Sequence, residues 1–192
     1  MKNYFIIGML FLATNLIGQT YPKYDSTLKI GKVGYRISCF NKSAEHNNLT
    51  IRPIGFKAEV REISSEIRAR VLSAEIDDLN NDGFPEVIIF IEESRGNKSL
   101  FCISSKENER MEGIFFPDIT DDMQLSKGYR GKDEFKLVEG VLFRKFPIFD
   151  TDTANKIPTP KMRQILYRVV PGEQGSWKFK AFRNFDTNAT VQ

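Results

Sequence analysis

The segment that most constrains the fold is IDDLNNDGFPEVIIFI, residues Ile76–Ile91, in which an acidic turn leads directly into a strongly apolar run. This run, Val87–Ile91, contains no polar residue at alternate positions. A strand with one face in solvent alternates apolar and polar side chains, whereas a strand covered on both faces is apolar throughout. The segment therefore predicts a central β-strand with protein packed against both of its faces.

Most of the remaining hydrophobic pattern has a period of two and is interrupted by turn signals at short intervals, with no convincing helical stripe. Tyr35, Ile37 and Cys39, for example, alternate with polar residues. Three predicted hairpins turn at RGNKS (95–99), Glu139–Gly140 and PGEQGS (171–176). Met111–Lys127 is less regular and is expected to be a long loop with a short helical turn, and the polar stretch Asn184–Gln192 is expected to fray. The pattern predicts an all-β fold, an antiparallel β-sandwich or flattened barrel in a single domain.

The N-terminal segment has the features of a secretory signal peptide. Lys2 supplies a positive charge, Phe5–Ile17 is almost entirely apolar, and Gly18 is a small residue suited to cleavage after it. A retained membrane anchor is the alternative, but the apolar run is short for crossing a bilayer. We therefore predict a signal peptide at 1–18 and a periplasmic or secreted domain at 19–192, without a membrane span.

Composition and the distribution of ionisable residues argue against two classes of protein. The chain has 28 Lys and Arg against 25 Asp and Glu, a net charge of +3, which is too weak to indicate a nucleic-acid partner. His46 is the only histidine and lies in a polar stretch, where it is expected to be exposed. Asp133 and Glu134 are adjacent, so in a strand they point to opposite faces and do not converge on one substrate. They are expected to pair with Arg130 or Arg144, and we predict a protein that is not an enzyme.

The two cysteines acquire a specific interpretation if the chain is exported. Cys39 lies in YRISCF and Cys102 in LFCIS, both of which are strand-like. In an oxidising compartment a single pair can close a disulfide, and the long loop between these two would add roughly 4 kcal/mol of stability. We expect this disulfide, and the alternative is two buried thiols on separate strands.

The acidic turn carries oxygen-bearing side chains at the spacing of a calcium loop. Asp78, Asn80, Asp82 and Glu86 occupy loop positions one, three, five and nine, and the backbone carbonyl of Phe84 would lie near them. Such spacing lets a tight turn direct several oxygens at one hard cation, so calcium is the expected ion.

The same residues also have an interpretation without a metal. The twelfth loop position is Ile89, where an EF-hand requires a bidentate Glu, and a strand follows in place of a helix. Asn81, Asp82 and Gly83 form a turn cluster that tolerates positive φ, and Glu86 could be a solvent-facing strand residue. Both interpretations remain open from the sequence.

Four segments together resemble the PliI family, the periplasmic inhibitors of invertebrate-type lysozyme. They occur in the family's order and cover most of the predicted mature chain. They are GKVGYRISCF (31–40), SAEIDDLNNDGFPEVIIFI (73–91), GYRGKDEFKLVEGVLFRKFPIF (128–149) and MRQILYRVVPGEQGSWKFKAF (162–182). The resemblance implies an antiparallel β-sandwich or flattened barrel, often paired as a homodimer, without catalysis of its own.

The resemblance also implies where a partner would bind. The family inserts a loop with a Ser-Gly-x-Tyr motif, located after the central strand, into the substrate cleft of the lysozyme. Here the equivalent turn is ESRGNKSLF, residues 93–101, in which Gly96 matches the family's Gly. Arg95 and Lys98 stand at the Ser and Tyr positions, and Ser94 and Ser99 are displaced hydroxyls. The chain therefore departs from the family's motif at both hydroxyl positions.

Two functional hypotheses follow. In the first, the chain binds a lysozyme-like glycosidase through Ser94, Arg95, Gly96, Asn97, Lys98 and Ser99, and the two basic residues pair with the carboxyl groups of the cleft. In the second, the chain is a calcium-stabilised carbohydrate- or envelope-binding module without inhibitory activity. The alternative for the turn itself is an ordinary solvated hairpin connection.

Overall fold

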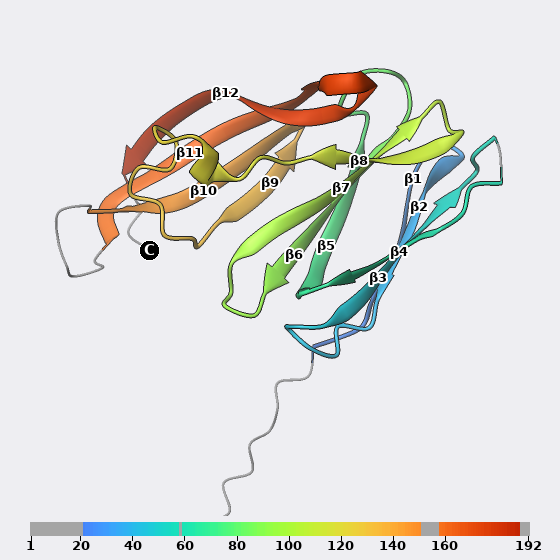
Figure 1. Ribbon diagram of the computed structural model, residues 1–192, viewed down its shortest axis with the longest axis horizontal. Helices are drawn as coiled ribbons and strands as arrows, with labels where there is room; N and C mark the ends of the chain where they lie inside the picture. Colours follow the sequence, from blue (N-terminus) through green and yellow to red (C-terminus); the bar gives the residue numbers. More distant parts are fainter. Residues whose placement is uncertain (1–20, 58, 151–157, 189–192) are drawn as a thin grey trace, which may run out of the picture.

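The computed structural model describes residues 21–57, 59–150 and 158–188, and the predicted signal peptide lies outside these ranges. The described chain forms β-strands and two short 3-10 helices, arranged as two sheets (Figure 1). The all-β prediction is therefore confirmed. Within the described ranges no helix combines the length and apolar character that a membrane span would need.

The smaller sheet contains the first four strands in sequence order, and each neighbouring pair is antiparallel. Its strands are β1 (Tyr24–Ile30), β2 (Val33–Cys39), β3 (Asn47–Ile54) and β4 (Ile63–Ile67). Tyr35 and Ile37 on β2 are fully buried, whereas Arg36 between them is exposed. The sheet thus has one face in a core and one face in solvent, as the period of two predicts.

The larger sheet has the strand order β5-β6-β7-β8-β12-β11-β10-β9. Its strands are β5 (Ala69–Asp77), β6 (Glu86–Glu93), β7 (Lys98–Lys106), β8 (Arg110–Phe115), β9 (Glu134–Val138), β10 (Val141–Phe149), β11 (Pro158–Pro171) and β12 (Trp177–Asn188). All three predicted hairpins are present, as β6–β7, β9–β10 and β11–β12. One difference is that β8 and β12 run parallel, through the pairs Ile114–Trp177 and Phe115–Lys178. Parallel neighbours need a long connection, which β9 to β11 provide here.

Strand β6 is covered on both faces, as its continuous apolar run predicts. Val87 and Ile89 pack into a core cluster shared with the smaller sheet. Ile88 and Phe90 point the opposite way, into a second cluster shared with β10, β11 and β12. Val87, Ile88 and Ile89 are all fully buried. The strand therefore forms part of a middle layer between two hydrophobic cores.

The larger sheet curls until its two edges approach each other, so that it forms a nearly closed barrel around the second cluster (Figure 1). Phe90 on β6 and Phe135 on β9 stack across this approach, with ring centroids 6.4 Å apart. Curling lets one sheet bury its own inner face, which a flat sheet of this width could not do.

A buried arginine, Arg144, lies inside the barrel. Arg144 on β10 donates from Nε to Asp133 Oδ1 at 2.6 Å, and the Tyr129 hydroxyl donates to Asp133 Oδ2 at 2.5 Å. The guanidinium carbon is also 5.1 Å from the centroid of the Tyr129 ring. Burial and the hydrogen bond to Asp133 raise the pKa of Tyr129 to about 12. The predicted pairing of Asp133 with Arg144 is confirmed, and the exposed Glu134 points to the other face as expected.

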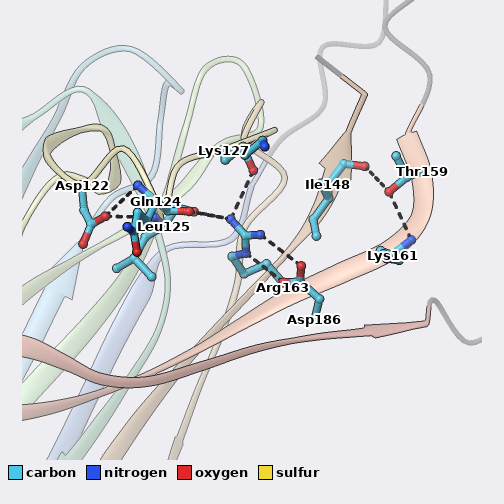
Figure 2. A network of polar contacts seen from close by, with 9 residues as sticks. All are labelled: Asp122, Gln124, Leu125, Lys127, Ile148, Thr159, Lys161, Arg163 and Asp186. Atoms are coloured by element: carbon cyan, nitrogen blue, oxygen red, sulfur yellow. Dashed lines mark hydrogen bonds and ion pairs between the residues drawn. The ribbon is translucent and has the colours of Figure 1, made fainter. Parts of the chain in front are cut away.

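A second arginine attaches the loop after β8 to the β11–β12 hairpin (Figure 2). Arg163 Nη1 donates to the backbone carbonyls of Gln124, Leu125 and Lys127 at 2.9, 3.0 and 3.2 Å. Its Nε and Nη2 donate to the two carboxylate oxygens of Asp186 at 2.9 and 3.1 Å. One side chain thus satisfies three loop carbonyls and pairs two strands, which fixes the position of a loop that has few regular backbone hydrogen bonds.

Two predictions of irregular structure need correction. Met111–Lys127 is a loop only in part, because β8 continues to Phe115; the predicted helical turn is the 3-10 helix η1 (Ile119–Asp121). The prediction that Asn184–Gln192 frays is wrong for 184–188, which belongs to β12 because β11 pairs with it along its length, and 189–192 lie outside the described residues. A further 3-10 helix, η2 (Glu173–Gly175), lies in the β11–β12 connection.

The predicted disulfide is wrong. Cys39 and Cys102 are both buried free thiols. Cys39 belongs to the cluster between the two sheets, whereas Cys102 belongs to the cluster inside the barrel. The reason is the alternation along β7, since Ile103 faces the cluster that contains Cys39 and its neighbour Cys102 faces away. Burial raises the pKa of the Cys102 thiol well above its usual value.

Candidate functional site

The predicted partner-binding residues lie at the β6–β7 turn, which we define as residues 94–97 between the two strands. Glu93 N donates to Asn97 O and Gly96 N donates to Glu93 O, both at 2.9 Å. Gly96 has φ +75°, a left-handed conformation that glycine adopts without strain. Ser94, Arg95 and Gly96 are exposed, so the tip of the turn is accessible to a partner.

The structure separates the two basic residues that the sequence placed together. Arg95 lies at the exposed tip, whereas Lys98 is the first residue of β7 and is half-buried. Lys98 lines a groove of about 300 Å³ between β5 and β9, together with the carboxylate residues Glu75 and Glu134. Ser99 likewise belongs to β7, where it pairs with Ile91. Arg95 is therefore the basic side chain of this set that can enter a partner's cleft.

The turn is in contact with the segment that follows η1. Gly131 has φ +81°, and a Cβ atom at this position would lie 2.5 Å from Asn97 Oδ1. The side chain of Asn97 therefore packs against the backbone of residue 131, where any side chain larger than that of glycine would clash with it. Gly131 belongs to the sequence GYRGKDEF, whose Tyr129 and Asp133 are fixed inside the barrel by Arg144. The sequence does not predict this contact, for which the available signal is the glycine at position 131.

The acidic loop is organised by hydrogen bonds between its own side chains and backbone. Asp78 accepts from Asp82 N at 3.1 Å and from Gly83 N at 3.0 Å. Asn80 Oδ1 accepts from Asp82 N at 2.9 Å, and Asp82 Oδ1 accepts from Phe84 N at 2.9 Å. The side chains thus hold the tight turn that the sequence predicts.

Glu86 is fully buried, which corrects the alternative that made it a solvent-facing residue. One carboxylate oxygen accepts from Leu79 N at 2.8 Å, and the other accepts from Ser104 Oγ at 3.0 Å. Burial raises its pKa to about 8, and these two hydrogen bonds limit the increase. These hydrogen bonds therefore offset only part of the desolvation of the carboxyl group.

Two carboxylates of the loop converge on one amide group. Asn80 Nδ2 lies 2.8 Å from Asp82 Oδ2 and 3.5 Å from Glu86 Oε1. Within the described ranges, no three acidic, histidine or cysteine side chains are grouped as a metal site would require. Asp78, Asn80, Asp82 and Glu86 therefore form one hydrogen-bonded unit, and calcium binding stays a prediction.

Comparison with known proteins adds no family assignment. The chain matches no protein-family model and no curated protein. The resemblance to the PliI family thus rests on the four sequence segments alone.

Proposed function

We propose that this chain is a non-catalytic protein-binding domain that inhibits a lysozyme-like glycosidase by inserting the β6–β7 turn into its cleft. The observation that carries the proposal is an exposed arginine, Arg95, at the tip of a turn held from two sides. Backbone hydrogen bonds at the ends of β6 and β7 fix the turn on one side, and the packing of Asn97 against Gly131 fixes it on the other.

The chemistry of a glycosidase cleft suits this turn. Such a cleft contains two carboxyl groups that flank the scissile bond. A guanidinium group pairs with carboxylates through charge-assisted hydrogen bonds, and Gly96 leaves room for close approach of the backbone. A turn already fixed by its flanking strands loses little conformational entropy on binding, which favours affinity.

The test is binding to purified invertebrate-type lysozyme, with activity and affinity measured in parallel. Truncation of a buried charged anchor typically costs about 2–5 kcal/mol, so Arg95→Ala should weaken the complex by at least tenfold, mainly through faster dissociation. Lys178→Ala, a basic residue on β12, is the control and should bind as wild type does. Affinity should also fall with added salt, because part of the attraction is screened.

Gly131→Ala provides an independent test of how the turn is held. A methyl group there would meet Asn97 Oδ1 and would also strain the backbone at φ +81°, so the variant should bind more weakly while Arg95 is intact. Inhibition by Arg95→Ala equal to that of wild type would show that the turn is not the contact. If the wild-type chain inhibits no lysozyme of any type, the inhibitor function is wrong for this chain.

A second candidate function is a calcium-stabilised module that binds carbohydrate or another envelope component. The observation that favours it is the convergence of Asp82 and Glu86 on Asn80 Nδ2, a point where the Asp82 carboxylate would attract a cation and where cation binding would release the proton of Glu86. A ligand that binds only the folded state raises the melting temperature by mass action. Calcium should therefore raise the melting temperature over that in chelator, and Asp82→Ala should abolish the difference.

A further inference from the structure

The exposed face of the smaller sheet contains a polar hollow of about 260 Å³ that shares no residue with the β6–β7 turn or with the acidic loop. Its floor is formed by Ser38 on β2 and Thr50 on β3, which are direct partners in the sheet. Arg36 and Arg52, also direct partners, rise on one side of this floor. A pair of short side chains beside a pair of long ones produces a depression in an otherwise flat sheet.

The opposite wall of the hollow carries an exposed aromatic ring. Phe40 follows β2 and is 62% exposed, and Asn48 lies beside it on β3. The Nζ atoms of Lys23 and Lys42 are each 5.3 Å from the centroid of the Phe40 ring. An aromatic surface next to hydroxyl and amide groups can stack on the apolar face of a sugar ring while the polar groups bind its hydroxyls.

The two arginines at the other wall are an electrostatically unfavourable pair. Like charges directly opposite each other on neighbouring strands destabilise a sheet. Each arginine is compensated by one carboxylate: Arg36 donates from Nε and Nη2 to Asp25 at 2.9 and 3.1 Å, and Arg52 donates from Nε and Nη2 to Glu62 at 3.0 and 2.8 Å. The Nη1 group of each makes no hydrogen bond to any part of the chain that the structure describes, and both remain available to a ligand.

The residues around the hollow also leave an excess of positive charge. Lys23, Arg36 and Arg52 line it, whereas Asp25 and Glu62 pair with the two arginines, so the three basic groups exceed the two carboxylates by one. The hydrogen bonds from Arg36 and Lys23 hold the pKa of Asp25 well below its usual range, so this carboxylate is fully ionised and is already included in the balance. A ligand with one negative charge would therefore meet an attractive field.

We propose that this hollow binds an anionic saccharide unit, with its ring on Phe40 and its acidic group between Arg36 and Arg52. Ser38, Thr50 and Asn48 would bind its hydroxyl groups. The volume is below the range of about 300–1,000 Å³ found for pockets that hold drug-sized ligands, which suits a single sugar ring of a longer chain. The shared chemistry is a pyranose with a carboxylate or sulfate, from either a polyuronate or a sulfated glycan.

The experiment is calorimetric titration of the mature domain with an oligogalacturonate, a sulfated oligosaccharide and a neutral galactose oligosaccharide of equal length. The neutral sugar should bind at least tenfold more weakly than one of the two acidic sugars, and added salt should reduce acidic-sugar binding. The relative affinity of the carboxylated and sulfated probes identifies the acidic group.

Variants test the two walls separately. Arg36→Gln with Arg52→Gln should weaken acidic-sugar binding at least tenfold, and Phe40→Ala should weaken it at least fivefold. Arg110→Gln is the matched control, since Arg110 is an exposed arginine on β8 paired with Glu112, and it should bind as wild type does. Melting curves should show that every variant is folded. Arg95→Ala should also bind sugar normally, which separates this site from the β6–β7 turn.

Three results would overturn the proposal. The first is the absence of binding to both acidic probes. The second is undiminished binding by the double arginine variant. The third is arginine-dependent binding to vesicles of anionic phospholipid that Phe40→Ala leaves unchanged, which would identify a phosphate-bearing surface in place of a saccharide.

Discussion

Glu86 should make the stability of this protein fall as pH rises through neutrality, which is the reverse of the usual effect of a carboxyl group. Its pKa in the folded protein is about 8, against an ordinary value of 4.5, because burial disfavours the charged form. A group whose pKa is raised by folding contributes its full stability below the unfolded value. That contribution is lost as pH rises through the folded value.

The size of the effect follows from the shift. Each pKa unit corresponds to about 1.36 kcal/mol, so a shift from 4.5 to about 8 gives a total of roughly 5 kcal/mol. Part of this is already lost at pH 6, which leaves about 2–3 kcal/mol to be lost between pH 6 and pH 9. For a domain of this size, that corresponds to a decrease in melting temperature of roughly 5–10 °C.

The assay is thermal unfolding at pH 6, 7, 8 and 9 in the presence of chelator. Glu86→Gln stays neutral and can still accept from Leu79 N, so it should lose less stability over this range and exceed wild type at pH 9. Burial also raises the pKa of Glu75, so this group adds a loss of stability in the same direction as pH rises through its own raised pKa. Glu93→Gln, at the exposed end of β6, is the control and should follow wild type. Equal pH dependence in Glu86→Gln and wild type would refute the reasoning.

Three further expectations concern buried or shielded groups. Arg144→Ala leaves the buried carboxylate of Asp133 without its cation, so chemical denaturation should show a free energy of unfolding lower by about 3–5 kcal/mol. Arg144→Lys should recover only part of this loss. A decrease below about 1 kcal/mol in Arg144→Ala would contradict the role of the pair. Arg163→Ala should lower the free energy of unfolding by about 1–3 kcal/mol, because three loop carbonyls lose their donor. Amide hydrogen exchange should become faster in residues 119–128 and stay unchanged in β6, which serves as the reference. Cys39 and Cys102 should react with a thiol reagent only after unfolding; absence of reactive thiols in the denatured, unreduced protein would show that they are oxidised.

The parts of the fold that the sequence predicts are those governed by local pattern. The apolar run Val87–Ile91 indicated a strand covered on both faces because its composition depends directly on that burial. The three hairpins were predictable because their turns use Gly, Asn or Pro at short range. The parallel β8–β12 pair was not predictable, since it joins residues about sixty positions apart and has no local signal.

The candidate sites likewise differ in whether local sequence or tertiary packing forms them. The β6–β7 turn and the acidic loop were found from contiguous residues. The contact of Asn97 with Gly131 and the hollow between Arg36 and Arg52 depend on packing or on strand register, which the sequence alone does not set. The cysteines illustrate the same limit, because the side of β7 that Cys102 occupies decides whether it can reach Cys39.

The middle layer formed by β6 and β7 has a consequence for unfolding. Detachment of the smaller sheet would expose Val87, Ile89 and Ile103 to water, and opening of the barrel would expose Ile88 and Phe90 from the same layer. Either event exposes one face of β6 and β7 while the other face is still packed. Loss of one core therefore destabilises the other core. The two cores should therefore melt in a single cooperative transition. A chain cut between β4 and β5 would yield neither half as an independent folding unit.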